Sequence, residues 1–279
     1  MISTWFARLR PAGPRRLVRW LVALTVLAIG AVAAAVSFAD TTKPVADCAG
    51  LPDQPRLKAA LQAVIKQGKN ANTGLGNQEW AVVVNRDGLV CAVAFSGPDR
   101  GAQWPGSRVI AAEKANTANA LSLPDFALST ANLWAGAQPG QSLYSLVTSA
   151  PPNAQAVYGG SPADYGQASD PLVGKAIGGV IVFGGGLPLY DASGKLVGGL
   201  GLSGDTSCAD HVIAWKIRYA LKLDAVPAGV AQNSNDNMIL DVQNGSSLSG
   251  FGHPSCKGGK PSDDTIKALP NQFPTGKKK

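Results

Sequence analysis

Three segments of the chain carry apolar residues at the spacing of an α-helix. In the first, Leu57, Leu61 and Val64 fall on one face and lysines occupy the other, which is the pattern of an amphipathic helix. The third begins at Thr206 or Ser207, either of which can cap a helix N-terminus. Helices are therefore predicted over residues 55–70, 107–121 and 207–221.

Two hairpins are predicted between these helices. Residues 79–95 hold two β-rich runs on either side of Asp87–Gly88, a dipeptide that suits the positive φ angles of a tight turn. Residues 178–203 are predicted to form a strand, a glycine break at 184–186, a second strand, a turn at 191–194 and a third strand. The order helix, hairpin, helix, long excursion, hairpin, helix predicts an α+β fold with an antiparallel sheet flanked by helices.

The remaining segments have no strong periodicity. Residues 122–177 contain prolines, glycines and scattered aromatic residues, and they are too long for a simple connection unless they cover something. Beyond Ala225 the chain is rich in Pro, Gly, Asn and Ser and ends in three lysines. We expect one domain over residues 40–225 with a long insertion at about 122–177, followed by a C-terminal arm over 226–279 with a disordered Lys-rich tip.

The N-terminal segment has the composition of an export signal. It holds five arginines and no acidic residue, and an apolar run extends from Leu21 to Ala39. Small residues at Ser37 and Ala39 suit cleavage before Asp40, but the run is also close to the ~20 residues that span a bilayer. Residues 1–39 are thus predicted to be a signal peptide or an N-terminal membrane anchor. Either one places the rest of the chain in the periplasm or outside the cell, because positive residues stay inside.

The charge balance changes once this segment is set aside. Removing its five arginines from the 25 basic residues leaves 20, against 18 acidic residues. Such a nearly neutral chain lacks the basic surface that nucleic-acid binding requires. The composition therefore excludes nucleic acid as a partner.

The stretch GLGLSGD resembles two catalytic or cofactor motifs. Gly199, Gly201 and Gly204 spell the dinucleotide fingerprint, but the strand before them returns from a hairpin and not from a β-α-β unit. The serine-hydrolase elbow would need glycine where Asp205 stands. We interpret the glycines as positions where a strand and a helix pack closely.

Four cysteines in an oxidising compartment favour two disulfides, although composition permits three pairings. The predicted bonds are Cys48–Cys91 and Cys208–Cys256. The first would pin the start of the domain to the first hairpin, and the second would hold the arm against the last helix. The alternative is a metal site, because Cys208, Asp210 and His211 have the spacing of ligands on one helix.

In order and spacing, the elements resemble the GlcG-like haem-binding family, also called the haem-degrading domain family. The resemblance runs from Leu57 to Leu223 and rests on WAVVVNRDGLVCAVAF, GSRVIAAEKANTANA and GGVIVFGGGLPLYDASGKLVGGLGLSGDTSCADHVIAW. It implies a profilin-like domain that assembles into homo-oligomers and, in some secreted members, binds haem or iron and supports haem degradation. The long insertion and the cysteine-tied arm make the chain similar to a longer, exported branch of the family.

The resemblance also implies where haem would bind. The K-A-x-T-A stretch of the family matches Lys114 and Thr117, which are the first candidates for haem contact. Haem further needs cations for its propionates and a ligand for its iron. Lys114, Arg108 and Lys175 are the candidate cations, and the candidate iron ligands are His211, His253, Met238 and the tyrosines, with Thr117 and Lys114 as weaker donors. The plainer alternatives are a solvated charge for each cation and a capping or packing role for His211. Replacing Lys114 and Thr117 with alanine is expected to weaken hemin binding and to leave the thermal midpoint nearly unchanged.

The leading hypothesis is an exported protein that binds or senses haem or iron and forms a homo-oligomer. The rival hypothesis is an enzyme of the same fold that degrades haem or acts on a small organic acid. A third is a structural or partner-binding module without a cofactor.

Overall fold

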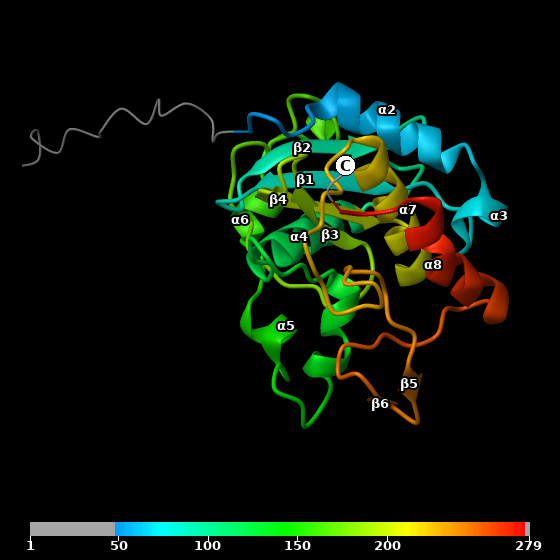
Figure 1. Cartoon of the computed structure of the whole chain (residues 1–279). Coiled ribbons are helices and arrows are strands. Elements are labelled where there is room, and N and C mark those ends of the chain that lie inside the picture. The colour runs from blue at the N-terminus through cyan, green and yellow to red at the C-terminus, as the bar shows by residue number, and fades with distance from the viewer. Residues whose placement is uncertain (1–47, 277–279) are drawn as a thin grey trace, which may run out of the picture. The chain divides into compact units, whose positions relative to one another are not determined.

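The computed structural model describes residues 48–276, and its centre is a four-stranded antiparallel sheet (Figure 1). The strands are β1 (Trp80–Asn85), β2 (Val90–Phe95), β3 (Gly186–Tyr190) and β4 (Leu196–Ser203), in the order β2-β1-β4-β3. Each hairpin contributes two neighbouring strands, and β1 pairs with β4, so the two hairpins meet in the middle of the sheet. The predicted α+β fold with an antiparallel sheet is confirmed.

Helices cover both faces of this sheet because its strands are apolar on both sides. Along β1, Ala81 and Val83 belong to one core and Val82 and Val84 to the other, as the two-residue period of a strand requires. The helices are α2 (Gln54–Ile65) and α7 (Ser207–Ala220) on the first face and α4 (Ser107–Ala120) on the second. A short helix, α3 (Lys69–Asn72), follows α2. Two buried faces explain why the strands are nearly continuous apolar runs.

Glycines on β4 let α4 lie close to the sheet. A Cβ atom on Gly201 would lie 1.9 Å from the carbonyl oxygen of Ala111, and one on Gly199 would lie 2.2 Å from that of Ala115. Since glycine has no Cβ, the helix backbone can approach the strand at these positions. The glycine pattern therefore serves close packing of strand and helix, as the sequence indicated.

One predicted strand does not form. Within the described chain, residues 180–183 belong to no strand. Side chains of other elements bind their backbone instead: Ile181 N–H donates to Thr117 Oγ1 at 3.0 Å, and Thr130 Oγ1 donates to the Phe183 carbonyl at 2.7 Å. These bonds satisfy groups that a strand ladder would otherwise pair, so the segment lies against α4 and does not extend the sheet.

The insertion consists of short helices joined by loops. They are η1 (Thr130–Leu133), η2 (Ala135–Ala137), α5 (Leu146–Ser149), α6 (Ala154–Val157) and η3 (Pro162–Asp164). Leu172 and Ile177, near its end, are buried in the second core beside α4. The insertion thus covers part of the α4 face of the sheet.

The arm contains a helix that the sequence pattern had not predicted. Its elements are β5 (Val242–Gln243), β6 (Ser246–Ser247) and α8 (Lys260–Gln272). A proline in the first turn and the three-residue spacing of Ile266 and Leu269 were signals for α8. Both of these side chains are fully buried in the first core, where α8 packs on α7. The arm therefore contributes to the core of the protein.

Two disulfides join Cys48 to Cys91 and Cys208 to Cys256, which are the pairs expected from the sequence. In residues 48–276, no helix combines the length and the apolar character needed to cross a membrane. The predicted signal peptide or anchor, residues 1–39, and the lysines at 277–279 lie outside the described residues.

Candidate functional site

Lys114 lies in α4 and points into the protein interior. Its Nζ donates to Asp210 Oδ2 at 2.6 Å and to the carbonyl oxygen of Leu202 at 2.9 Å, and it lies 4.8 Å from the ring centroid of Phe183. The side chain is fully buried. The interpretation of Lys114 as a solvated charge is therefore wrong, because its ammonium is neutralised by a carboxylate of the same chain.

Glu79 is buried beside this ion pair. Burial raises the pKa of Glu79 well above its ordinary value, and the negative charge of Asp210 raises it further, whereas Lys114 lowers it. Burial also raises the pKa of Asp210, and the ammonium of Lys114 opposes this effect. We infer that Glu79 holds a proton while Asp210 keeps its charge for Lys114, so the three groups together carry no net charge.

Thr117 is fully buried one turn further along α4. Its hydroxyl donates to the Glu113 carbonyl at 2.7 Å and accepts from the Ile181 N–H at 3.0 Å. Burial also raises the pKa of the Glu113 carboxyl to about 7. Thr117 thus acts here as a bridge between the helix and the segment before β3.

Arg108 fixes the insertion to α4. Its guanidinium forms a two-point ion pair with the carboxylate of Asp170 and donates to the Val157 carbonyl at 2.8 Å. It also lies 3.7 Å from the centroid of the Tyr165 ring. Arg108 is 2% exposed, so a solvated charge is the wrong interpretation for this residue too.

His211 is fully buried in α7, against the arm. Its Nε2 lies 3.2 Å from Asn237 Oδ1 and 3.3 Å from the backbone nitrogen of Met238, and its Nδ1 has no hydrogen-bond partner among residues 48–276. Burial lowers the pKa of His211 to about 4, so the imidazole is neutral at pH 7. Nε2 can serve only one of its two neighbours at a time, because one needs a donor and the other an acceptor.

These four side chains do not form an open site. Lys114 and His211 are linked through Asp210, the neighbour of His211 in α7, whereas Arg108 belongs to the contact with the insertion. The alternative metal site fails, because Cys208 is bonded to Cys256 and Asp210 is paired with Lys114. For any of these four side chains to contact a ligand, either its internal hydrogen bonds must break or the neighbouring residues must move.

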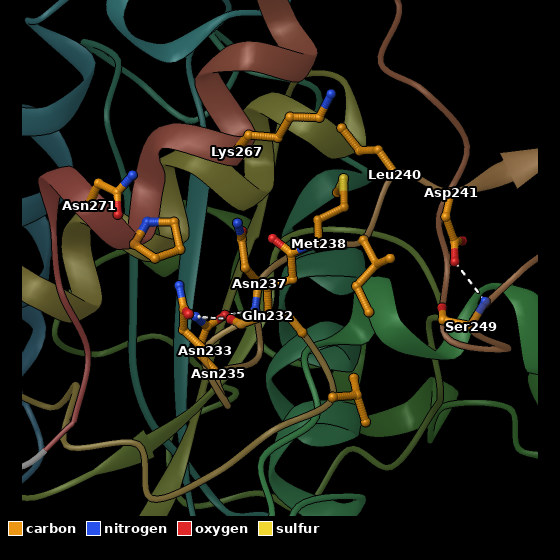
Figure 2. Close-up of a pocket in the computed structure, with 14 residues that line it drawn as sticks. Gln232, Asn233, Asn235, Asn237, Met238, Leu240, Asp241, Ser249, Lys267 and Asn271 are labelled. Carbon is orange, nitrogen blue, oxygen red and sulfur yellow. Dashed lines mark hydrogen bonds between the residues drawn. The ribbon is translucent and has the colours of Figure 1, made fainter.

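An open pocket exists elsewhere, within the arm, between α8 and the loop before it (Figure 2). We call it the arm pocket; it is lined by residues of 230–241, Ser249 and three residues of α8, and its volume is about 600 Å³. This is within the ~300–1,000 Å³ typical of small-molecule sites. The sequence reasoning missed the pocket because each of its walls is locally an irregular Asn- and Ser-rich loop or the unpredicted helix.

Buried bonds hold the walls of the arm pocket in place. Asp236 forms a two-point ion pair with Arg218 of α7, at 2.6 and 2.8 Å. The side-chain oxygen of the next residue, Asn237, lies 3.2 Å from His211 Nε2. The side-chain N–H of Asn237 donates to the Ile266 carbonyl of α8 at 2.9 Å. The wall formed by residues 230–241 is therefore tied to both α7 and α8.

The fold defines an α+β protein whose four-stranded antiparallel sheet is covered by helices on both faces. The chain belongs to the family of HbpS-like haem-degrading proteins, whose model matches residues 56–217. The resemblance to the haem-degrading domain family is thereby confirmed, and the arm pocket lies beyond the matched residues.

Two solved structures are similar to this chain. One is the crystal structure of a PduOC–haem complex, with 25% identity, a TM-score of 0.41, and coverage of 60% of this chain and 89% of that chain. The other is protein ORFY of Klebsiella pneumoniae, with 21% identity, a TM-score of 0.40, and coverage of 59% and 87%. No curated protein matches this chain.

Proposed function

We propose that this protein binds or senses haem or iron outside the cytoplasm. Membership of the haem-degrading family carries the proposal, because the matched residues, 56–217, include the whole sheet and α4. Binding is preferred to turnover because the two cations of α4, Arg108 and Lys114, are buried in ion pairs with carboxylates of the same chain. Family membership supports a haem-related function, and the preference for haem binding over haem turnover is part of our proposal.

The chain offers groups of the kinds that haem needs. His211 provides a neutral imidazole, the form that ligates iron, but its ring is fully buried behind Asn237 and Met238 and would contact iron only after these residues move. Haem supplies a redox-active iron, and the protein would hold the ring and its propionates. We retain Lys114, Thr117 and Arg108 as proposed contacts only for a state in which their internal bonds have opened.

Titration with hemin tests the function. The protein without residues 1–39 is expected to show a saturable Soret shift near one haem per chain. A linear, unsaturated response would favour the structural or partner-binding module. His211→Gln should change the position or intensity of the Soret band if His211 is the ligand, and Lys222→Gln, at an exposed position, is the control.

Haem degradation is the second candidate function, favoured by the description of the family. If the bound haem is turned over, the Soret band should decay after a reductant is added in air and should stay when oxygen is removed. A band that is stable in air over the same period supports binding alone.

We also propose a periplasmic or secreted location, with the protein either free or anchored through residues 1–39. The two disulfides support this proposal, because such bonds persist in oxidising compartments. A fusion of residues 1–47 to a reporter that is active only outside the cytoplasm should be active, and deletion of residues 1–39 should abolish that activity.

A homo-oligomer is a further proposal. The family resemblance supports it, as do large exposed apolar side chains such as Trp104, 54% exposed, and Tyr158, 72% exposed. Light scattering on the protein without residues 1–39 should give a mass that is a multiple of one chain, and the mass of a single chain would contradict the proposal.

A further inference from the structure

The arm pocket lies outside the residues matched by the family and has its own binding chemistry. We propose that the arm pocket binds a carboxylated tetrapyrrole through the apolar ring faces and the carboxylates of the ligand, without coordinating iron. This inference rests on the proposed haem-related function, because that function supplies the class of ligand. It differs from that function by naming a site in the arm and a mode of binding.

Part of the pocket lining is apolar. Leu240 lines it (Figure 2), as do Ile239 and Pro270, and all three are partly exposed, whereas Met238 is only 4% exposed and belongs to the first core. The Met238 sulfur lies 3.8 Å from Cys208 Sγ, so the thioether packs against the Cys208–Cys256 disulfide. Such a surface suits the ring of a large apolar ligand.

The rim of the pocket on α8 carries a cation and a carboxamide. Lys267 and Asn271 are four residues apart and both line the pocket, so they share one helix face. Both are exposed, and Lys267 forms no salt bridge with any of the described residues. An ammonium and a carboxamide N–H together suit a carboxylate.

The acidic side chain of the lining is already engaged. Asp241 accepts from Ser247 Oγ and from the Ser249 N–H, each at 2.7 Å. These bonds hold its carboxylate against its own turn. Burial alone would raise the pKa of Asp241, but the hydrogen bonds from the two serines together outweigh burial and lower it. Lys267 is therefore the charged group of the rim that a ligand can pair with.

Iron coordination is absent from this mode because the lining residues include no histidine or cysteine. His211 lies behind Asn237, and the Met238 sulfur packs on the disulfide. The ion pair between Asp236 and Arg218 keeps this wall fixed, so ligand binding costs little ordering of the arm. The geometry thus predicts that a metal-free ring binds as well as an iron-containing one.

Binding of metal-free protoporphyrin IX and of hemin tests the inference on the protein without residues 1–39. Protoporphyrin is followed by its fluorescence and hemin by tryptophan quenching. Their dissociation constants should agree within about threefold. Lys267→Glu should weaken both by about tenfold or more, because it places a like charge next to the ligand carboxylate. Lys257→Glu makes the same charge change at an exposed position outside the lining and should have no effect.

A second variant fills the pocket without changing its charge. Ala231→Trp should reduce binding of both rings, with an unchanged thermal midpoint showing that the fold is intact. Saturable hemin binding without protoporphyrin binding, or equal effects of Lys267→Glu and Lys257→Glu, would overturn the inference and leave the proposed function standing. If neither ring binds the parent protein, both the inference and the proposed function fail.

Discussion

Glu79 is a carboxyl group that folding removes entirely from water. Its pKa is raised in the folded protein, whereas in the unfolded chain it has the ordinary value for Glu, about 4.3. At pH values between these two pKa values, the unfolded chain gives up a proton that the folded chain keeps. The free energy of unfolding then falls as pH rises, by up to about 1.4 kcal/mol per pH unit. Below about pH 4.3 both states hold the proton, and the effect vanishes.

Glu79→Gln should therefore stabilise the protein relative to the parent, and more so as pH rises from 4 to 8. Glutamine keeps the shape of the side chain but has no acidic proton to lose. Urea unfolding across this pH range measures the difference, and Asp264→Asn, at an exposed position, is the control. A difference that does not depend on pH would show that Glu79 is ionised in the folded protein.

Lys114→Ala should lower the free energy of unfolding by about 3–5 kcal/mol, because it leaves the Asp210 carboxylate buried without its partner. This corrects the expectation that alanine at 114 and 117 would leave the thermal midpoint nearly unchanged. Lys66→Ala, at an exposed position, should change stability by less than about 0.5 kcal/mol. Asp210→Asn in the Lys114→Met background should recover part of the loss, and an unchanged midpoint for Lys114→Ala would contradict the buried ion pair.

At the scale of elements, the contact between α4 and β4 depends on missing side chains. Gly201→Ala would place a Cβ 1.9 Å from a backbone oxygen of α4, and neither element can shift without disturbing the sheet. We expect a loss at or above the usual ~1–3 kcal/mol for overpacking. Gly106→Ala is the matched control, because a Cβ there meets nothing within 4 Å and φ is −63°. Equal unfolding midpoints for the two variants would argue against this packing.

At the scale of the whole molecule, the Cys208–Cys256 bond holds the arm to the domain. Its removal by replacing both cysteines with alanine should cost about 4 kcal/mol in the chain-entropy model, since it closes a separation of 48 residues. The Cys48–Cys91 bond closes a similar separation of 43 residues but lies away from the arm, so its removal is the control. Limited proteolysis should cut the arm faster only in the first variant, and equal cutting would contradict the anchoring role.

Much of the fold was predictable because its signals are local. The spacing of Leu57, Leu61 and Val64, the Asp87–Gly88 turn and the Thr206 cap each act within a few residues, and each matches an element of the structure. The oxidising compartment inferred from the N-terminal segment made disulfides the natural use of the cysteines. The family resemblance rested on the order of the same local elements.

Tertiary structure alone decided what the candidate residues contact. The carboxylates that neutralise Arg108 and Lys114 lie 62 and 96 residues away in sequence, and no local pattern shows whether such a cation is solvated or buried. Residues 180–183 fail to form a strand for the same reason, since distant threonines satisfy their backbone. The arm pocket arises only when α8 and the loop before it pack on α7. A sequence determines which segments are helical or extended through short-range periodicity, whereas pairing and burial depend on groups that folding brings together from far apart in the chain.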